Sequence, residues 1–212
     1  NAVSVELIAE CSTNHGGSVS LAKEFIHAFA PYVDTIKFQL TRVKHLRRED
    51  PQYEWFARAE LTIDQFAELK AECHKAGVGF LLTVYNAADV WEVENLGCTR
   101  VKVGSGEANE WNLSKALLQA KLDPVISCGI HHPGYVDSPW RSGYHERGDY
   151  YTTAPFECYT FLGCCTRYPA PDGLASGILN GKAYQGWSDH AIGLNELKAA
   201  VCCGAQILET HV

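Results

Sequence analysis

The stretch that decides the fold runs from residue 79 to residue 107 and reads GFLLTVYNAADVWEVENLGCTRVKVGSGE. Its first part, residues 79–84, is a short apolar run that predicts a β-strand. Residues 87–96 then predict a helix, which Gly97 closes, because glycine is common just after a helix. A second short strand is predicted over residues 100–103. The stretch is therefore a strand–helix–strand unit, from which parallel sheets are built.

The same alternation continues on both sides of this unit. Further strands are predicted over residues 5–9, 35–39, 124–128, 159–165, 184–188 and 206–209. Helices are predicted over residues 20–29, 113–122 and 195–203. Another helix is predicted to begin at Thr62, where Thr62 and Gln65 form a capping box. Residues 42–54 predict a polar loop.

Eight strands with helices between them predict parallel βα units in a single domain that spans residues 1–212. Right-handed crossovers favour an α/β fold closed as a (β/α)8 TIM barrel, and a doubly wound open sheet is the alternative. We expect the barrel to be incomplete. The sequence stops just after the eighth strand and leaves no eighth helix, and a polar, aromatic loop over residues 129–157 replaces the fifth helix.

Composition places the chain among ordinary globular proteins and excludes several functions. Its 212 residues are 46% hydrophobic and 20% charged, with a net charge of −7. Because there is no basic excess, nucleic-acid binding is not expected. No run of about 18 apolar residues and no signal-peptide pattern occurs, so we expect no membrane segment. The nine cysteines include no Cys-x-x-Cys pair and are interpreted as reduced thiols of a cytoplasmic protein.

Polar side chains gather where the predicted strands end, which is the active-site face of a parallel barrel. Lys37 and Lys102 stand inside apolar runs, and lysine is rarely buried without a partner. Alternation along the strands places three pairs of side chains each on a common face: Lys37 with Gln39, Ser188 with His190, and Glu209 with His211. If these faces point inward, their side chains meet at one mouth of the barrel.

His190 and His211 are the candidate metal ligands. They follow the last two predicted strands, which are neighbours in a closed barrel and lie about 5 Å apart. Two imidazoles at that spacing can bind one divalent ion and leave positions open for water and substrate. Two histidines that only form hydrogen bonds are the alternative interpretation.

Lysine and hydroxyl donors beside a glycine-rich turn suggest a site for a phosphate or a carboxylate. The Gly104-Ser105-Gly106 turn lets the backbone approach an anion closely, although it lacks the spacing of a P-loop. The candidate donors are Lys37, Lys102, Ser105, Ser127 and Ser188. Three glutamates are candidates for acid–base chemistry or for pairing with the lysines: Glu10, Glu107 and Glu209.

Six motifs occur in a fixed order along the chain. They are Ile8-Ala9-Glu10 with Asn14-His15-x-Gly17, Lys37-Phe38-Gln39, Lys102-Val103-Gly104-Ser105-Gly106-Glu107, Tyr168-Pro169-Ala170-Pro171, Trp187-Ser188-Asp189-His190-x-x-Gly193 and Glu209-Thr210-His211. Together they resemble the sialic acid synthase family, whose members make N-acetylneuraminate and related nonulosonic acids. The resemblance covers nearly the whole chain, and the set of six is more specific than any one motif.

This resemblance implies a metal-dependent enzyme that condenses phosphoenolpyruvate with an N-acylated aldose such as N-acetylmannosamine and releases a nonulosonic acid and phosphate. It implies a divalent metal, usually Mn²⁺, on His190 and His211, where the ion polarises the sugar aldehyde. It also implies catalytic roles for Glu10, Glu209 and His190. The residues that the resemblance assigns to substrate binding are Lys37, Gln39, Thr83, Lys102, Ser105, Glu107, Ser127, Thr166 and Ser188.

The sequence departs from the family pattern in three places. The family continues past the eighth strand into a helix and a C-terminal antifreeze-like domain, residues 129–157 replace a helix, and Gly163-Cys164-Cys165 stands where His-Cys is usual. A homodimer is one expected way to cover the strand surface that the absent helix leaves. Two alternatives stay open. One is a barrel that binds phosphoenolpyruvate and metal but takes another aldehyde, with residues 130–157 lining the acceptor site, and the other is a non-catalytic binding module.

Overall fold

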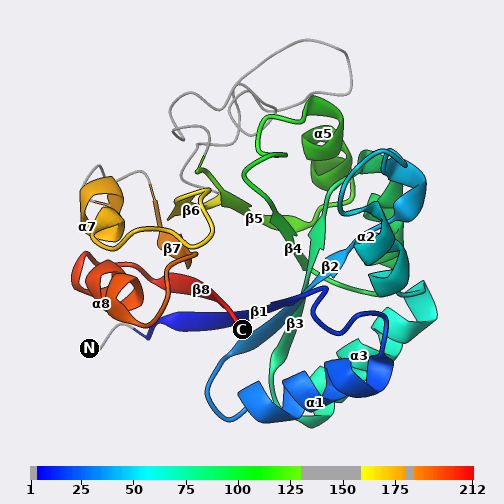
Figure 1. The fold of residues 1–212 in the computed structure, drawn as a ribbon, viewed down its shortest axis with the longest axis horizontal. Helices are drawn as coiled ribbons and strands as arrows, with labels where there is room; N and C mark the ends of the chain where they lie inside the picture. Colours follow the sequence, from blue (N-terminus) through cyan, green and yellow to red (C-terminus); the bar gives the residue numbers. More distant parts are fainter. Residues whose placement is uncertain (1–3, 130–158, 180–183) are drawn as a thin grey trace.

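The computed structural model describes residues 4–129, 159–179 and 184–212, which form a closed barrel of parallel strands (Figure 1). The strands follow one another around the barrel in sequence order, and β8 pairs with β1 to close it. They are β1 (Glu6–Ser12), β2 (Thr35–Leu40), β3 (Gly79–Val84), β4 (Arg100–Val103), β5 (Asp123–Ser127), β6 (Thr160–Cys164), β7 (Gly186–Asp189) and β8 (Ile207–His211). The predicted barrel is confirmed, and the doubly wound open sheet is excluded.

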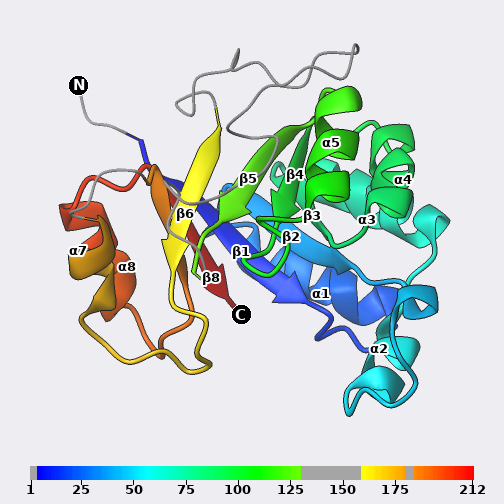
Figure 2. The same cartoon turned by 90° about the horizontal axis from the view of Figure 1, so that it is seen from above.

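Helices surround this barrel. Those in the described residues are α1 (Val19–Phe29), α2 (Tyr53–Ala59), α3 (Ile63–Lys75), α4 (Val90–Asn95), α5 (Trp111–Gln119), α7 (Leu174–Leu179) and α8 (Asn195–Cys202), with the 3-10 turns η1 (Val43–His45) and η2 (Ala87–Asp89). Helices α1 to α5 lie along one side of the barrel, and α7 and α8 pack against each other on the other side (Figures 1 and 2). No helix among the described residues has the length and apolar character needed to cross a bilayer.

Local signals in the sequence set several helix ends. Ser18 accepts a hydrogen bond from the backbone N–H of Leu21 and begins α1. Thr62 and Gln65 form the predicted capping box at the start of α3, each side chain accepting from the other residue's backbone N–H. Gly77 follows α3 with a φ of +78°, a left-handed conformation that glycine adopts without strain.

Some elements differ from the prediction. The polar stretch 42–54 contains η1 and the start of α2, so it is not all loop, and the predicted helix 87–96 is split into η2 and α4. Strands β1 and β8 run on to Ser12 and His211, so Glu10 and His211 lie within strands rather than beyond them. The predicted loop 129–157 lies outside the described residues except for Gly129. Val212 is the one residue that follows β8 in the sequence given.

Helix α7 is an element that the sequence analysis did not predict. It follows Gly173 and begins at Leu174, with no local capping side chain. Its first N–H groups are instead bound by Glu196 of α8, whose buried carboxylate accepts from Gly173, Leu174 and Ala175 at 2.5, 3.0 and 2.7 Å. Because this cap comes from a residue more than twenty positions away, no local pattern reveals it.

Alternation along the strands separates an outer apolar layer from a polar interior. In β2, Ile36, Phe38 and Leu40 are buried among the apolar side chains of the core, whereas Lys37 and Gln39 line the cavity inside the barrel. Full burial of each large apolar side chain contributes about 1.5–3 kcal/mol. The layer between strands and helices therefore stabilises the barrel and leaves its interior free for polar side chains.

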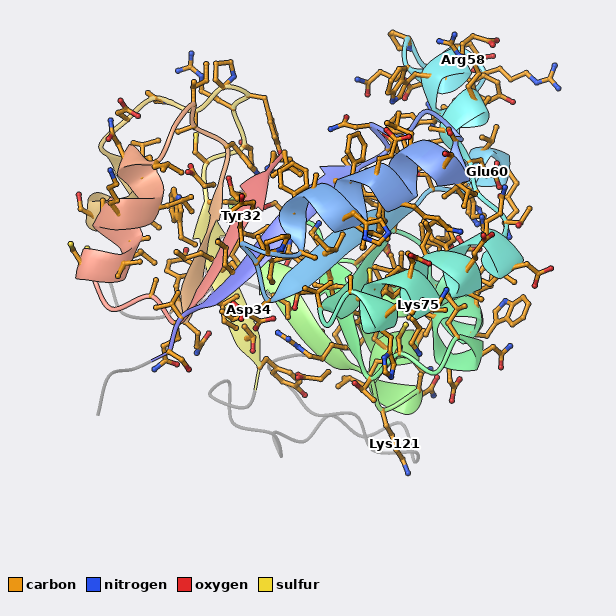
Figure 3. The ribbon with its side chains drawn as sticks, turned by 90° about the horizontal axis from the view of Figure 1, so that it is seen from below. Tyr32, Asp34, Arg58, Glu60, Lys75 and Lys121 are labelled. Carbon is orange, nitrogen blue, oxygen red and sulfur yellow. The ribbon has the colours of Figure 1, made fainter. Side chains whose placement is uncertain are left out.

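The two ends of the barrel differ in what they carry. Asp34 and Lys121, which precede β2 and β5, lie toward one end, whereas Arg58 and Glu60 near α2 lie toward the other (Figure 3). The α2 end is the one at which the parallel strands finish. Active sites of (β/α)8 barrels lie at that end.

Candidate active site

The carboxyl ends of the strands surround a cavity of about 240 Å³, to which every strand contributes a side chain. Its walls are Glu10, Lys37, Gln39, Thr83, Tyr85, Lys102, Gly104, Ser105, Gly106, Ser127, Cys164, Thr166, Tyr168, Ser188, His190, Glu209 and His211. The structure thus brings together all the predicted site residues except Glu107.

Lys37 lies in the floor of the cavity and is 3% exposed. Its Nζ atom is 2.5 Å from Glu10 Oε2 and 3.6 Å from Glu209 Oε2, and it donates a hydrogen bond of 2.9 Å to Thr83 Oγ1. Burial alone would lower the pKa of Lys37, but the two carboxylates outweigh burial and raise this pKa. The lysine therefore stays charged in the floor.

Lys102 is the second buried cation of the floor. It donates to Ser127 Oγ at 2.7 Å and lies 3.5 Å from Glu209 Oε1, the oxygen that also accepts from Ser188 Oγ at 2.7 Å. Burial would raise the pKa of Glu209, but Lys102, Lys37 and the Ser188 hydroxyl together lower it. Glu209 is therefore an ionised carboxylate that links both lysines.

Glu10 lies between the lysines and the histidines. Strand pairing places it beside Lys37 on β2 and beside His211 on β8. Gln39 donates to Glu10 Oε1 at 2.7 Å, and the residue is fully buried. A carboxyl group at this position can hold or release a proton next to a ligand bound on the floor.

Ser105 is held in the Gly104–Gly106 turn by two neighbours. Its Oγ accepts a hydrogen bond of 2.9 Å from the backbone N–H of Gly129 and lies 3.0 Å from Cys164 Sγ. Burial raises the pKa of the Cys164 thiol, so its proton is available for Ser105. When both neighbours donate to Ser105 Oγ, the serine's own hydroxyl proton is free to bind a ligand anion.

His190 and His211 lie side by side at the rim, with ring centroids 4.8 Å apart. Each Nδ1 bonds to a backbone carbonyl, His190 to Cys165 and His211 to Asp189 at 3.1 Å. Such bonds place the ring proton on Nδ1 and leave the Nε2 lone pair for a ligand. Burial, chiefly, lowers the pKa of His190 to about 4, so its imidazole is neutral at pH 7.

This donor set fits a divalent metal with open coordination positions. Neutral imidazoles with anchored Nδ1–H groups are the form in which histidine binds metals. Among residues 4–129, 159–179 and 184–212, no group of three or more His, Cys, Asp or Glu side chains is arranged to hold an ion. Two imidazoles are thus the donors that this part of the chain offers.

Three cavity residues were missed as site residues by the sequence analysis: Tyr85, Cys164 and Tyr168. Tyr168 stacks on His190 with ring centroids 4.0 Å apart, and its hydroxyl is 2.8 Å from His190 Nε2. Tyr85 directly follows β3, and Cys164 ends β6 on its inner face. Their positions at or just after strand ends are the signal that could have identified them as site residues. The motif match also included Tyr168, but it assigned no role to that residue.

Glu107 lies apart from the floor. It lines a neighbouring cavity of about 310 Å³, which meets the main cavity at Tyr85, the residue common to both. Burial raises the pKa of Glu107. We call this second cavity the side pocket; it is lined by Leu40, Thr41, Arg42, His45, Leu46, Phe56, Tyr85, Asn86, Asp89 and Glu107.

Comparison with known proteins places this geometry in a family. The family model described as NeuB family matches residues 27–212. One relative is N,N'-diacetyllegionaminic acid synthase of Campylobacter jejuni, which is 27% identical over 97% of this chain and 66% of its own length. Another is N-acetylneuraminate-9-phosphate synthase of Drosophila melanogaster, which is 27% identical over 98% of this chain and 60% of its own length. The chain therefore spans less than two thirds of the length of these relatives.

Solved structures share the same barrel. An N-acetylneuraminic acid synthetase from Leptospira borgpetersenii, crystallised with citrate, superposes with a TM-score of 0.79 at 24% identity and covers 98% of this chain and 73% of its own. The spore coat polysaccharide biosynthesis protein spsE of Bacillus subtilis superposes with a TM-score of 0.78 at 25% identity. The match covers 98% of this chain and 59% of the spsE chain. Because the family model matches most of the sequence, and the barrel and its strand-end residues agree with the motifs, the chain belongs to the NeuB family.

Proposed function

We propose that this barrel condenses phosphoenolpyruvate with an N-acylated aldose and yields a nonulosonic acid and phosphate. The observation that carries the proposal is one cavity that combines two buried lysines, several hydroxyl donors and two imidazoles. The names of two relatives, a diacetyllegionaminic acid synthase and an N-acetylneuraminate-9-phosphate synthase, support an N-acylated sugar acid as product.

The floor binds the anionic donor in this proposal. Charged ammonium groups and hydroxyls make the strongest hydrogen bonds to phosphate and carboxylate oxygens. Lys37 and Lys102 are both at most 3% exposed, so water competes little for them. The remaining donors to the ligand are Gln39, Thr83, Ser105, Ser127, Thr166 and Ser188.

His190 and His211 would hold the metal, for which Mn²⁺ is the ion we propose. When bound, a divalent ion polarises the aldehyde oxygen of the acceptor as a Lewis acid. The chain itself fixes both rings through their Nδ1–H bonds, and burial keeps the His190 imidazole neutral at pH 7 by lowering its pKa. Tyr168, whose hydroxyl now bonds His190 Nε2, gives up that bond when the nitrogen takes another ligand.

Glu10 handles the proton in this reaction. The C2=C3 π electrons of phosphoenolpyruvate form the bond from carbon 3 to the aldehyde carbon, which leaves an alkoxide on the acceptor and a cationic carbon 2. A water oxygen then bonds to carbon 2, and the Glu10 carboxylate takes one water proton and passes it to the alkoxide. The bond from carbon 2 to the bridging oxygen breaks last, and the departing phosphate takes the remaining hydroxyl proton, which leaves the 2-keto group. Glu209 positions both lysines, because it lies 3.5–3.6 Å from their Nζ atoms.

Free thiols support a reducing, cytoplasmic setting for this enzyme. All eight cysteines in the described residues are unpaired, and four of them are buried.

Phosphate release from phosphoenolpyruvate tests the function. We expect release only with both Mn²⁺ and N-acetylmannosamine, and a loss of about 100-fold or more in His190→Ala, because a Lewis acid supplies several kcal/mol. His74→Ala is the matched control, since His74 is exposed beside a different cavity at the start of β3. No release with this or related N-acyl aldoses, from a folded protein that binds phosphoenolpyruvate, would overturn the proposal.

A further inference from the structure

A further cavity lies at the end of the barrel opposite the proposed active site, the end that Asp34 marks in Figure 3. It has a volume of about 520 Å³ and opens where β3 and β4 begin, beside α3. We call it the lower cavity; its lining includes Thr35, Lys70, Phe80, Leu81, Cys98 and Arg100. Sites for small molecules have volumes of roughly 300–1,000 Å³, so its size suits a ligand.

The lower cavity and the active-site cavity lie one behind the other along three strands. On each of β2, β3 and β4, one side chain lines the lower cavity, and the side chain two residues later lines the active-site cavity. The pairs, in that order, are Thr35 and Lys37, Leu81 and Thr83, and Arg100 and Lys102. Because alternate residues of a strand share a face, each pair points the same way at two depths of the barrel.

Side chains between the two cavities keep them separate. Arg100 on β4 and Glu6 on β1 form an ion pair across the barrel through two hydrogen bonds, of 2.8 and 3.1 Å. Thr35 Oγ1 donates to the same carboxylate at 3.0 Å, and Leu81 is 1% exposed. Among the described residues, none lines both cavities. A ligand in the lower cavity therefore occupies a site of its own.

The charges around the lower cavity leave one cation without a carboxylate. Arg100 is balanced by Glu6. The Lys70 Nζ atom donates to the backbone carbonyls of Leu96 and Gly97 at 2.5 and 2.8 Å, and no Asp or Glu of the described residues lies within ion-pair distance of it. The described lining of the cavity also contains no carboxylate. One uncompensated positive charge favours a ligand with one negative charge.

Both cations have N–H groups left for such a ligand. An ammonium group has three N–H donors, and Lys70 gives two of them to carbonyls. A guanidinium group has five, and Glu6 accepts two of those of Arg100. A carboxylate has two oxygens that can each accept a hydrogen bond from one of these groups.

Much of the remaining wall is apolar. Val78, Phe80 and Leu81 contribute hydrocarbon surface, and Cys98 contributes a thiol. Burial raises the pKa of Cys98, so the thiol carries no charge at pH 7. Phe80 and Cys98 are both half-buried, so part of their surface is open to water. Covering that surface with the apolar body of a ligand is favourable.

We propose that the lower cavity binds a small molecule that carries one carboxylate on an apolar body. The carboxylate accepts hydrogen bonds from Lys70 and Arg100, and the body packs against Phe80 and Leu81. A phosphate dianion fits this site less well, because one uncompensated cation matches only one of its charges. The site goes beyond the proposed condensation and does not depend on it.

Cys98 reports on the occupancy of the lower cavity, because its thiol lines the wall. Alkylation of the whole protein by N-ethylmaleimide at pH 8 in EDTA, followed by peptide mass spectrometry, measures its accessibility. The probe is phenylacetate, and the comparisons are inorganic phosphate and 2-phenylethanol, which has a similar shape but no charge. We expect saturating phenylacetate to slow the labelling of Cys98 at least about fivefold, and 2-phenylethanol to need about a tenfold higher concentration.

The exposed Cys202 on α8 is the internal control, and its labelling rate should not change. Equal protection of Cys98 by 2-phenylethanol and phenylacetate would overturn the proposal. Protection by inorganic phosphate, or by none of the three compounds, would overturn it as well.

Variants of the wall give a second test. Lys70→Met keeps the length of the side chain but removes its charge, and calorimetric titration with phenylacetate should show about a tenfold higher Kd, with recovery in Lys70→Arg. Lys75→Met is the matched control, because Lys75 is exposed on the same helix and bonds Glu72. An unchanged Kd in Lys70→Met would contradict the proposal.

Thr99→Trp serves if circular dichroism shows that Lys70→Met does not fold. Thr99 is exposed in the lining, and a tryptophan there fills the lower cavity. Phenylacetate should then no longer bind, and unchanged affinity in this variant would refute the site.

Competition separates this site from the active-site cavity. Saturating phosphoenolpyruvate should leave the Kd of phenylacetate within about twofold, because the two ligands occupy different cavities. Displacement of phenylacetate by phosphoenolpyruvate would overturn the proposal. None of these readouts uses turnover, so a protein that releases no phosphate would refute the proposed condensation and leave this inference standing.

Discussion

Replacing Glu209 with glutamine tests whether the buried charges of the floor stabilise the barrel as pairs. The change keeps the size of the side chain but removes a negative charge 3.6 Å from Lys37 and 3.5 Å from Lys102. Lys37 keeps Glu10 at 2.5 Å. Lys102 loses the only carboxylate within ion-pair distance among the described residues, so an unpaired ammonium stays buried.

Removing one partner of a buried ion pair costs about 3–5 kcal/mol, because the other charge is left without compensation. The two side chains are 4% and 3% exposed, so solvent screens the charge little. Glutamine can still accept the hydrogen bond of Ser188, so we expect the loss of stability to lie near the lower limit of this range. We expect the free energy of unfolding at pH 7 to fall by about 3 kcal/mol.

The pH dependence of this loss has a definite sign. The lysines hold the pKa of Glu209 below its value in the unfolded chain. The ionised carboxylate therefore stabilises the folded state fully above the unfolded-state pKa, and this contribution is lost as the pH falls through the folded-state pKa. The difference between the unmodified protein and Glu209→Gln should shrink in acid.

Urea unfolding followed by circular dichroism, in EDTA at pH 7 and at pH 3, measures both effects. Glu68→Gln is the control: Glu68 pairs with Lys23 at 2.6 Å but is 53% exposed, so solvent screens the pair and its loss should be much smaller. Equal losses in the two variants at pH 7 would refute the reasoning. So would a loss in Glu209→Gln that is the same at pH 3 as at pH 7.

Two other predictions concern hydrogen bonds that support the site. Glu196→Ala removes the carboxylate that caps α7, and urea unfolding should show a loss of about 2–3 kcal/mol; a loss below about 0.5 kcal/mol would mean that water caps the helix equally well. Cys164→Ala removes the thiol 3.0 Å from Ser105 Oγ, and calorimetric titration should show about fivefold weaker binding of phosphoenolpyruvate. The same change in a Ser105→Ala background should have no further effect, and an equal loss in both backgrounds would contradict the coupling.

The strands were predictable because each is short, apolar and bounded by residues with clear local preferences. The predicted limits of the third and fourth strands, 79–84 and 100–103, match β3 and β4. Turn and cap chemistry acts over a few residues, so the capping box at Thr62 and the stop at Gly77 were also readable.

Helices α2 and α7 were not predictable in the same way. Helix α2 lies in a polar stretch without apolar periodicity, and its one buried residue is Ala59. Helix α7 depends on Glu196, a cap supplied by another helix. Tertiary contacts, rather than local propensity, stabilise both segments.

For the site, period-2 alternation was sufficient to place three pairs of side chains at one mouth of the barrel, because a closed barrel sends every second residue inward. These pairs are Lys37 with Gln39, Ser188 with His190, and Glu209 with His211. It could not reveal that Glu10 and Glu209 both pair with Lys37, since pairing across strands depends on register. It also could not separate Glu107 from the floor. That residue lies in a turn after β4, where no period fixes the direction of a side chain.

Charge pairing in the floor explains why hydroxyls accompany the lysines. The formal charges of Lys37, Lys102, Glu10 and Glu209 sum to zero, so net charge alone does not draw an anion into the barrel. Each lysine, however, already donates one N–H to a hydroxyl, at 2.9 and 2.7 Å. An oxygen of a bound anion can accept the lysine N–H in place of the hydroxyl oxygen, and it can also accept a hydrogen bond from the hydroxyl group. This arrangement supports the proposed binding of an oxyanion by the floor, and the carboxylates hold the two ammonium groups in position.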